Sequence, residues 1–212
     1  MLDHYLTIKT EGYHEINIQK SRFIGYVKRA ETENEAQDFI HSIKKKHHDA
    51  THNCSAYMIG ENNQIQKAND DGEPSGTAGV PMLEVLKQMN LKDTVIVVTR
   101  YFGGIKLGAG GLIRAYGNST SEVIRAVGVV KRQRMQGFKI TVDYTLLGKI
   151  ENELRQSDYI LNDIVYVEHV ECSVFVQVEQ TEQFIEWMTN ITNGKAAIKE
   201  TKQAYIEIDV EQ

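Results

Sequence analysis

The chain has 212 residues, of which 41% are hydrophobic and 25% are charged, and these values are ordinary for a folded soluble protein. The composition excludes a mainly disordered chain, a collagen-like repeat and a disulfide scaffold. Apolar stretches such as Val95–Val98 fall far short of the roughly 18 residues that a membrane helix requires, so we expect no membrane partner. The N-terminus does not resemble a secretory signal, and Cys54 and Cys172 lie far apart, which predicts a cytoplasmic protein.

The formal net charge of −5 is distributed unevenly along the chain. Residues 1–134 hold 18 Lys and Arg against 15 Asp and Glu, whereas residues 135–212 hold 6 against 14. Such asymmetry indicates two units with different surfaces, because the summed field controls which partners approach. We therefore predict two domains, residues 1–134 and residues 135–212.

The first part predicts strands and helices in alternation, beginning with a strand over residues 21–30. Thr32 and Glu35 have the spacing of a capping box, so a helix should begin there, with Lys44–Lys46 in its last turn. Further along, the pattern predicts strands over residues 54–60 and 64–68, a helix from about residue 80, a strand over residues 94–102 and a long helix over residues 112–130. Residues 94–99 are β-branched with little alternation, which is typical of a central strand covered on both faces.

The second part has a simpler order of elements. We predict, in turn, a strand over residues 137–144, a helix over 145–156, adjacent strands over 159–170 and 171–180, a helix over 181–191 and a strand over 196–210. The succession β-α-β-β-α-β is that of the ferredoxin-like motif, in which two helices pack on one face of an antiparallel sheet. The fold class is therefore α+β with two domains.

The segment after the predicted central strand is rich in glycine, with six of the chain's 16 glycines between Gly103 and Gly117. Between a strand and a helix, such a loop can direct several N–H groups and the helix dipole at an anion. The loop lacks the GK[ST] ending of a Walker A motif, so we predict no nucleotide cofactor. The candidate residues for binding phosphate or nucleic acid are Arg100, Gly103, Gly104, Lys106, Gly108, Gly110, Gly111 and Arg114.

A structural interpretation of the same loop is equally open. The glycines can serve close packing of helix on strand, and the basic residues can be solvated or paired with Asp70, Asp71 or Glu73. These carboxylates belong to a DDGE segment that can make a turn or hold a magnesium ion, and the turn is favoured. They are candidate rim residues of the site, together with His52 and Tyr101.

The sequence offers no signature of a metal site or of catalysis. His47, His52 and Cys54 are zinc-binding residue types, but their irregular spacing favours no metal. His52 and Cys54 share one strand face and should line the edge of the core or a pocket. No nucleophile–base pattern is present, so no catalytic residue is assigned.

The longest recognisable segments are NDDGEPSGTAGVPMLEVL and VIVVTRYFGGIKLGAGGLIRAYG. Together with SRFIGYVKRAETENEAQDFIHSIKKKHHDATHNCSAY upstream, they resemble the IMPACT N-terminal domain of the bacterial YigZ/YvyE family. The resemblance implies an N-terminal fold like the second domain of ribosomal protein S five and a C-terminal domain like the last domain of elongation factor G. It also implies a role near translation.

Three functions remain open at this stage. The favoured hypothesis is a translation-associated regulator that binds RNA, the ribosome or another phosphate-bearing ligand through the basic glycine-rich loop, with no specificity for DNA. Phe102, Tyr101, Tyr57 and Tyr116 offer aromatic rings on which bases can stack. The alternatives are an enzyme acting on a phosphorylated small molecule, or a hydrolase, and an adaptor that binds a translation-related protein without contacting nucleic acid.

Overall fold

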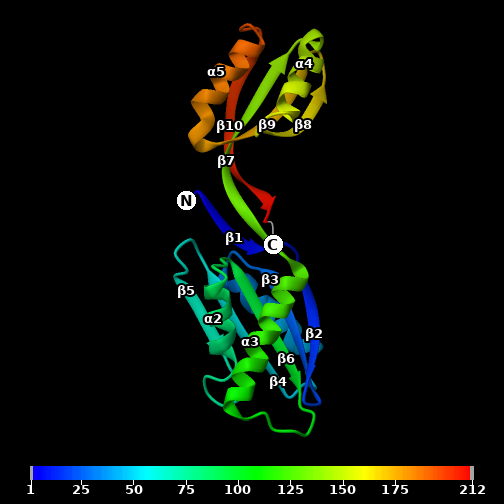
Figure 1. Ribbon diagram of the computed structural model, residues 1–212, viewed down its shortest axis with the longest axis vertical. Helices are drawn as coiled ribbons and strands as arrows, with labels where there is room; N and C mark the ends of the chain where they lie inside the picture. Colours follow the sequence, from blue (N-terminus) through cyan, green and yellow to red (C-terminus); the bar gives the residue numbers. More distant parts are fainter. Residues whose placement is uncertain (1, 211–212) are drawn as a thin grey trace. The chain divides into compact units, whose positions relative to one another are not determined.

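The computed structural model describes residues 2–210, and these form two compact units (Figure 1). One unit comprises the described parts of Met1–Lys131 and Ile208–Gln212, and the other comprises Arg132–Glu207. Both units contain helices and strands, which confirms the predicted α+β fold with two domains. The limits 1–134 and 135–212 stay a prediction, because one strand, β7 (Val129–Val142), runs through the boundary between the units.

The N-terminal unit is built on a five-stranded antiparallel sheet with the strand order β2-β3-β6-β4-β5. These strands are β2 (Gly12–Ile18), β3 (Ser21–Arg29), β4 (His52–Ile59), β5 (Ile65–Asn69) and β6 (Thr94–Tyr101). A short strand, β1 (His4–Ile8), is held beside the chain that enters β6 by a bridge between Leu6 and Leu91. The predicted central strand is therefore β6, which pairs with β3 on one side and with β4 on the other.

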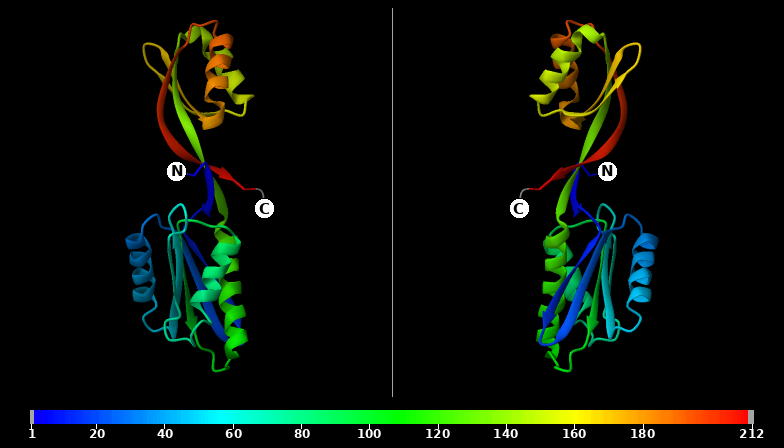
Figure 2. Two further views of the ribbon diagram at one scale, coloured as in Figure 1. Left: turned by 90° about the vertical axis from the view of Figure 1, so that its left-hand side faces the viewer. Right: turned by 90° about the vertical axis from the view of Figure 1, so that its right-hand side faces the viewer.

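Helices cover both faces of this sheet, as Figure 2 shows. Helix α1 (Glu33–Lys46) packs on one face, and α2 (Gly79–Gln88) and α3 (Gly108–Val127) pack on the other. Each face has its own hydrophobic core, and all residues of β6 before Tyr101 are buried. The prediction that this strand is covered on both faces is confirmed.

Alternation along β6 decides which side chains reach which core. Ile96 and Val98 belong to the core under α2 and α3, whereas Val95 and Val97 belong to the core under α1. Because side chains of a strand alternate between faces, Arg100 continues the first series and points toward α3. This alternation brings a cation to the end of the sheet where the chain leaves β6 for α3.

The start of α1 follows the predicted capping pattern in part. The Thr32 hydroxyl accepts a hydrogen bond from the N–H of Glu35 at 3.2 Å. The Glu35 carboxylate, however, accepts from the N–H of Glu31 at 2.8 Å, one residue before the cap, and not from Thr32. The predicted start of the helix is confirmed, and three lysines occupy its last turn as expected.

The C-terminal unit has the predicted β-α-β-β-α-β order. Its elements are β7, α4 (Tyr144–Arg155), β8 (Ile160–Tyr166), β9 (Val170–Gln177), a 3-10 turn η1 (Val178–Gln180), α5 (Thr181–Ile191) and β10 (Ala197–Asp209). Strands β9 and β10 both pair with β7, and β8 pairs with β9. Helices α4 and α5 lie on one face of this sheet (Figure 2), where Ile150 of α4 and Phe184 of α5 share a core with the strands. This is the ferredoxin-like arrangement.

Across residues 2–210, none of the helices combines the length and the apolar character needed to cross a lipid bilayer.

Candidate phosphate-binding site

The loop that joins β6 to α3, residues 102–107, owes its path to glycine. A Cβ atom at Gly103 would clash with the carbonyl oxygen of Lys20, so this loop can lie against the β2–β3 turn only without a side chain there. Gly104 has a φ of +86° and Gly108 a φ of +69°, which are left-handed values that favour glycine. Glycine is therefore needed at these positions for the path of the loop itself, as the structural interpretation of the loop proposes in part.

Helix α3 begins at the end of this loop without a side-chain cap. Within the described residues 2–210, no side chain caps its first N–H groups, and its first turn contains no acidic residue. The first turn includes Gly110 and Gly111, and Gly108 to Gly110 are exposed. Free N–H groups at a helix N-terminus carry partial positive charge and can bind an anion.

A pocket of about 430 Å³ opens beside this helix start. Its volume lies within the usual range for small-ligand sites. It is lined by Thr51, His52, Glu73, Pro74, Arg100, Phe102, Lys106, Leu107, Gly108, Ala109 and Leu112. The structure thus brings together five of the predicted site and rim residues, which come from four separate stretches of the chain.

Arg100 lies at the floor of this pocket and is only 5% exposed. Its Nη1 donates to Oε1 of Glu73 at 2.6 Å, and the hydroxyl of Tyr116 donates to the same oxygen at 2.8 Å. The side chain of Glu73 is 3% exposed, so the two charges neutralise each other in a largely buried ion pair. The alternative in which a basic residue pairs with Glu73 therefore holds for Arg100, although its Nε has no hydrogen-bond partner in the part of the chain that the structure describes.

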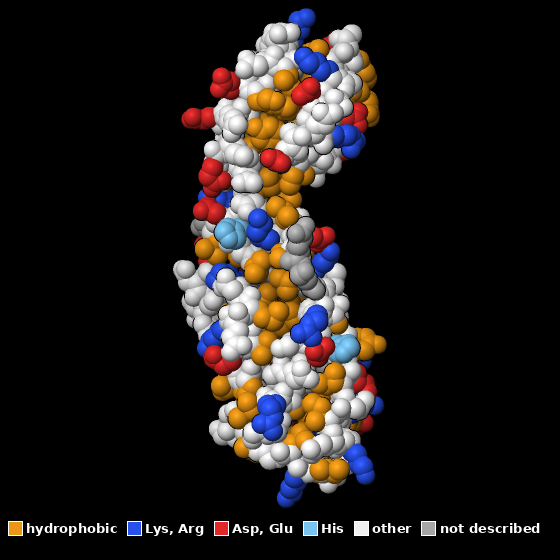
Figure 3. Space-filling view, viewed as in Figure 1, with side chains coloured by type: hydrophobic (Ala, Val, Ile, Leu, Met, Phe, Trp, Pro, Cys, Tyr) orange, Lys and Arg blue, Asp and Glu red, His pale blue; other side chains and the backbone are white. Residues whose placement is uncertain are grey.

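Two of the exposed cations near the loop are Lys106 and Arg114, neither of which forms a salt bridge with any residue in 2–210. Lys106 lines the pocket, and Arg114 lines an adjoining hollow with Gly111 and Gln19. Figure 3 shows Lys and Arg side chains at this end of the N-terminal unit. Of the three predicted cations, two are thus free to meet a ligand.

The rim carboxylate of Asp70 holds the start of α2. It accepts hydrogen bonds from the N–H groups of Gly76, Ala78 and Gly79 at 2.8, 3.0 and 2.8 Å. Burial alone would raise the pKa of Asp70, but these three donors outweigh it and keep the pKa below its ordinary value. Asp70 therefore acts as a helix cap and does not line the pocket.

Asp71 and Tyr101, also predicted at the rim, have partners elsewhere. The Asp71 carboxylate pairs with Lys44 at 2.6 Å and accepts from the N–H of Asn53 at 2.7 Å. The Tyr101 side chain lies on the α1 face of the sheet, where its hydroxyl contacts Nδ1 of His47 at 2.9 Å. The alternation of strand side chains is the signal that separates Tyr101 from Arg100.

His52 lines the pocket, whereas Cys54 is buried in the core two residues further along the strand. The thiol of Cys54 donates to the carbonyl oxygen of Asp70 at 3.0 Å, and burial raises its pKa to about 12. A thiol held in this way is a poor nucleophile. Among residues 2–210, no group of three or more His, Cys, Asp or Glu side chains is placed to hold a metal ion.

Apolar residues complete the pocket, and most of them escape sequence reasoning. Leu107, Leu112 and Pro74 belong to its wall, and Phe102, an expected stacking residue, is 46% exposed there. Of the other expected stacking residues, Tyr116 is fully buried and cannot meet a base. The leucines carry the helical periodicity of a core, and no local signal marks them as pocket residues.

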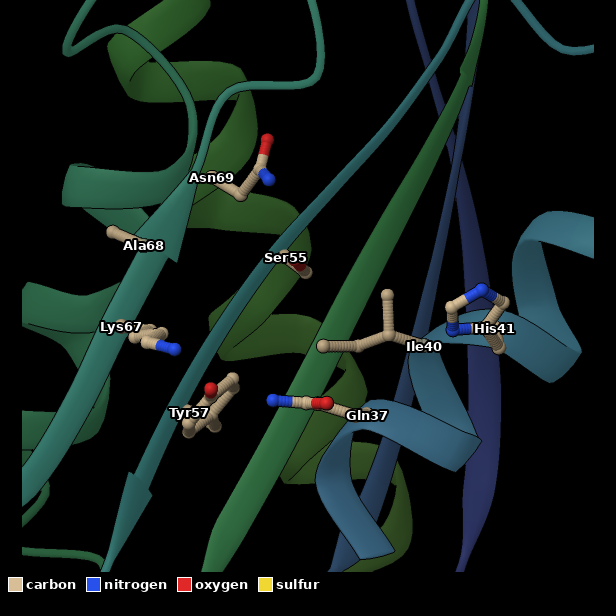
Figure 4. Close-up of a pocket in the computed structure, with 8 residues that line it drawn as sticks. All are labelled: Gln37, Ile40, His41, Ser55, Tyr57, Lys67, Ala68 and Asn69. Atoms are coloured by element: carbon tan, nitrogen blue, oxygen red, sulfur yellow. The ribbon is translucent and has the colours of Figure 1, made fainter. Parts of the chain in front are cut away.

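A second hollow, of about 220 Å³, lies on the opposite face of the sheet (Figure 4). Gln37, Ile40 and His41 reach it from α1, and five other residues reach it from β4 and β5. Its ionised and phenolic groups are already satisfied, since Lys67 and Tyr57 both contact the Glu33 carboxylate. This hollow is the weaker candidate for an anion site.

Comparison with known proteins gives the family. Residues 19–124 match the Impact N-terminal domain, and residues 140–195 match a domain of unknown function, DUF1949. The chain is 63% identical over 207 residues to the IMPACT family member YvyE of Bacillus subtilis, which covers 98% of this chain and 95% of that protein. The chain belongs to the IMPACT family. The resemblance identified from the sequence is thereby confirmed.

Two further matches have lower sequence identity. The IMPACT family member YigZ of Escherichia coli is 35% identical over 151 residues, which are 67% of this chain and 74% of that protein. A crystal structure described as that of a hypothetical protein matches with a TM-score of 0.61 and 29% identity, over 95% of this chain and 99% of that one. The match therefore extends over both units.

Proposed function

We propose that this IMPACT family member is a translation-associated regulator that binds RNA, on the ribosome or free, through phosphate groups at the loop between β6 and α3. One observation carries the proposal: the uncapped, acid-free first turn of α3 adjoins a pocket and two exposed cations, Lys106 and Arg114. Backbone N–H groups and cations in this combination are the usual means of holding a phosphate.

The charge available for phosphate contacts is smaller than the sequence suggests. Arg100 forms an ion pair with Glu73, so its charge is already neutralised. Of the predicted cations, Lys106 and Arg114 remain to contact phosphate groups. Each phosphate contact to a single strand contributes about 0.7 to the slope of log affinity against log salt, so two contacts predict about 1.4. This is a modest electrostatic footprint, and we infer that apolar contacts at the pocket supplement it.

The link to translation rests on the family. Proteins named IMPACT occur in eukaryotes, among them one of Dictyostelium discoideum that is 36% identical over 110 residues, half of this chain and 31% of that protein.

In the C-terminal domain, acidic residues outnumber basic ones by 14 to 6 over residues 135–212, which disfavours RNA there. We propose that this domain faces a protein.

The test is sedimentation of the full chain with ribosomes from a cell lysate, with and without ribonuclease. The variant is Lys106→Ala with Arg114→Ala, and the control is Lys87→Ala with Arg125→Ala, which removes the same charge from exposed residues elsewhere on α2 and α3. Co-sedimentation should be lost in the first variant only and should weaken with salt. Co-sedimentation that is insensitive to salt and to both variants would favour the adaptor.

The enzyme alternative makes a different prediction. In a screen of phosphate esters, turnover that is abolished by the Lys106→Ala and Arg114→Ala changes would replace the regulatory hypothesis. The buried thiol of Cys54 does not support this alternative, because its raised pKa keeps it protonated at neutral pH.

A further inference from the structure

A row of four aromatic rings crosses the sheet of the N-terminal unit on the face that carries α1. The rings belong to Tyr13 of β2, Tyr26 of β3, His47 at the end of α1 and Tyr101 of β6. Their successive centroids lie 5.6, 5.4 and 5.9 Å apart. Rings at these distances attract one another, so the row is a continuous structure.

Hydrogen bonds hold the middle of the row in place. The Tyr26 hydroxyl lies 2.7 Å from Nε2 of His47, and the Tyr101 hydroxyl lies 2.9 Å from Nδ1 of the same ring. The Tyr101 hydroxyl also donates to Oδ1 of Asp49 at 3.1 Å. Tyr26 and His47 are buried, whereas Tyr101 is half-buried and Tyr13 is exposed. The buried middle therefore fixes the two ends of the row, which a ligand can reach.

Tyr13 is the more accessible end, because α1 packs over other strands. Helix α1 packs on β4 and β6, whereas the alternate residues of β2 that share the face of Tyr26 are exposed, namely Tyr13, Glu15 and Asn17. Tyr13 is 65% exposed, the highest value among the exposed large hydrophobic residues of 2–210. Its ring is thus available to a flat group from a partner.

A cation stands over each end of the row. Nζ of Lys46 lies 5.8 Å from the ring centroid of Tyr13 and 4.8 Å from that of the next ring. Cζ of Arg22 lies 4.7 Å from the ring centroid of Tyr101. Lys46 is exposed and forms no salt bridge with the residues that the structure describes, whereas the preceding Lys44 pairs with Asp71. Positive charge and ring surface are therefore presented together.

This combination suits a single-stranded nucleic acid better than an acidic protein. Glu15 lies 3.5 Å from Arg22, and the Asp49 carboxylate is bonded to Tyr101, so carboxylates offset part of the positive charge. Attraction by charge alone is then small, which disfavours a partner that brings only acidic groups. A nucleic acid brings phosphates for the cations and also bases that stack on an exposed ring.

The row ends beside the candidate phosphate site. Tyr101 directly precedes Phe102, which lines the pocket next to α3. Arg22 follows the β2–β3 turn, whose Lys20 carbonyl lies against Gly103 of the loop. One strand of nucleic acid can therefore pass from the loop around the end of β6 to the row.

We propose that the row is a second contact region for single-stranded RNA, with a base stacked on Tyr13 and phosphates at Lys46 and Arg22. This inference rests on the proposed function and extends its binding surface to the α1 face of the sheet. Stacking is tolerant of sequence, so the row should bind without a strong preference among bases.

The test is the affinity of the full chain for a uridine oligonucleotide of about 12 nucleotides, measured by fluorescence anisotropy at several salt concentrations. Tyr13→Ala should lower the affinity about fivefold or more, which corresponds to about 1 kcal/mol from one stacked base. Tyr13→Phe retains the ring and should retain the affinity. Lys46→Ala should reduce the slope of log affinity against log salt by about 0.7.

The matched control is Tyr166→Ala with Lys199→Ala in the C-terminal unit. It removes a ring of similar exposure, 60%, and one exposed cation, and it should leave both affinity and slope unchanged. Because Tyr13 and Lys46 are exposed as well, their replacement should leave the fold intact.

The outcomes separate this inference from the proposed function. Unchanged affinity in Tyr13→Ala overturns the inference, while a loss in Lys106→Ala with Arg114→Ala would keep the proposed function. Affinity that falls as far in Tyr13→Phe as in Tyr13→Ala assigns the effect to the hydroxyl and overturns stacking. A loss in Tyr13→Ala without any loss in Lys106→Ala with Arg114→Ala supports the row and refutes the loop as the RNA site. Absence of RNA binding by the parent chain refutes both.

Discussion

Replacing Arg100 by alanine tests whether the cation at the pocket floor serves the fold or a ligand. Breaking a buried ion pair by removing one partner costs about 3–5 kcal/mol, because a buried charge is left unpaired. The Arg100 and Glu73 side chains are 6% and 3% exposed, and Tyr116 remains to donate to Glu73 after the substitution. We therefore expect a loss of about 3 kcal/mol in unfolding free energy, the lower end of that range.

At about 4 °C per kcal/mol for a domain of this size, the midpoint of thermal unfolding should fall by about 12 °C. A companion substitution, Arg100→Met with Glu73→Gln, removes both charges and should cost less than the sum of the single changes, with a coupling of about 2–3 kcal/mol. This coupling would identify the ion pair, as opposed to the bulk of the arginine, as the source of the loss.

The assay must separate the two units, since a two-domain chain need not unfold in one step. The chain has one tryptophan, Trp187 in α5, so its fluorescence in urea reports the C-terminal unit. Hydrogen exchange of β6 amides reports the N-terminal unit. If the opening free energy of the β6 amides in Arg100→Ala is within about 1 kcal/mol of its value in the parent chain, the structural role is refuted. Arg100 would then again be a candidate for contact with a ligand.

Three further predictions concern the same end of the molecule. Asp70→Ala should lower the free energy of unfolding, measured in urea at neutral pH, by about 1–2 kcal/mol. Because the pKa of Asp70 is depressed in the folded state, its stabilising contribution is present above the unfolded-state pKa and is lost as the pH falls below about 4. The difference in stability between variant and parent chain should therefore shrink at low pH. Gly103→Ala should lower the melting temperature more than Gly104→Ala, because the first clashes with Lys20 and the second costs only about 1 kcal/mol of backbone strain. Cys54 should react with iodoacetamide far more slowly than a free thiol at neutral pH, as mass spectrometry can measure; rapid labelling would contradict its burial.

The elements of the fold can be predicted because their signals are local. The run Val95–Val98 indicates a strand covered on both faces, and Thr32 lies where a helix should begin; the structure bears out both. The order of elements in residues 135–212 also defines a known motif without any tertiary information. Periodicity and caps are properties of neighbouring residues, so one sequence is enough.

The candidate site is harder to predict because its contacts join distant residues. Arg100 and Glu73 are 27 positions apart, and the sequence leaves open whether they pair. Two features bring Arg100 and Glu73 together. The register between β4 and β6 sets Arg100 opposite His52, and the Asp70 carboxylate fixes the start of α2, next to the turn that contains Glu73. Lys20, whose carbonyl requires Gly103, comes from another turn and has no sequence signal at all.

The central claim is that exposed cations at the start of α3 bind the phosphates of RNA. Its most direct test is the slope of log affinity against log salt for a single-stranded RNA, measured by fluorescence anisotropy for the parent chain and for Lys106→Ala with Arg114→Ala. We predict that the variant lowers affinity and reduces the slope by about 1.4. The same slope and affinity in both chains would contradict the claim.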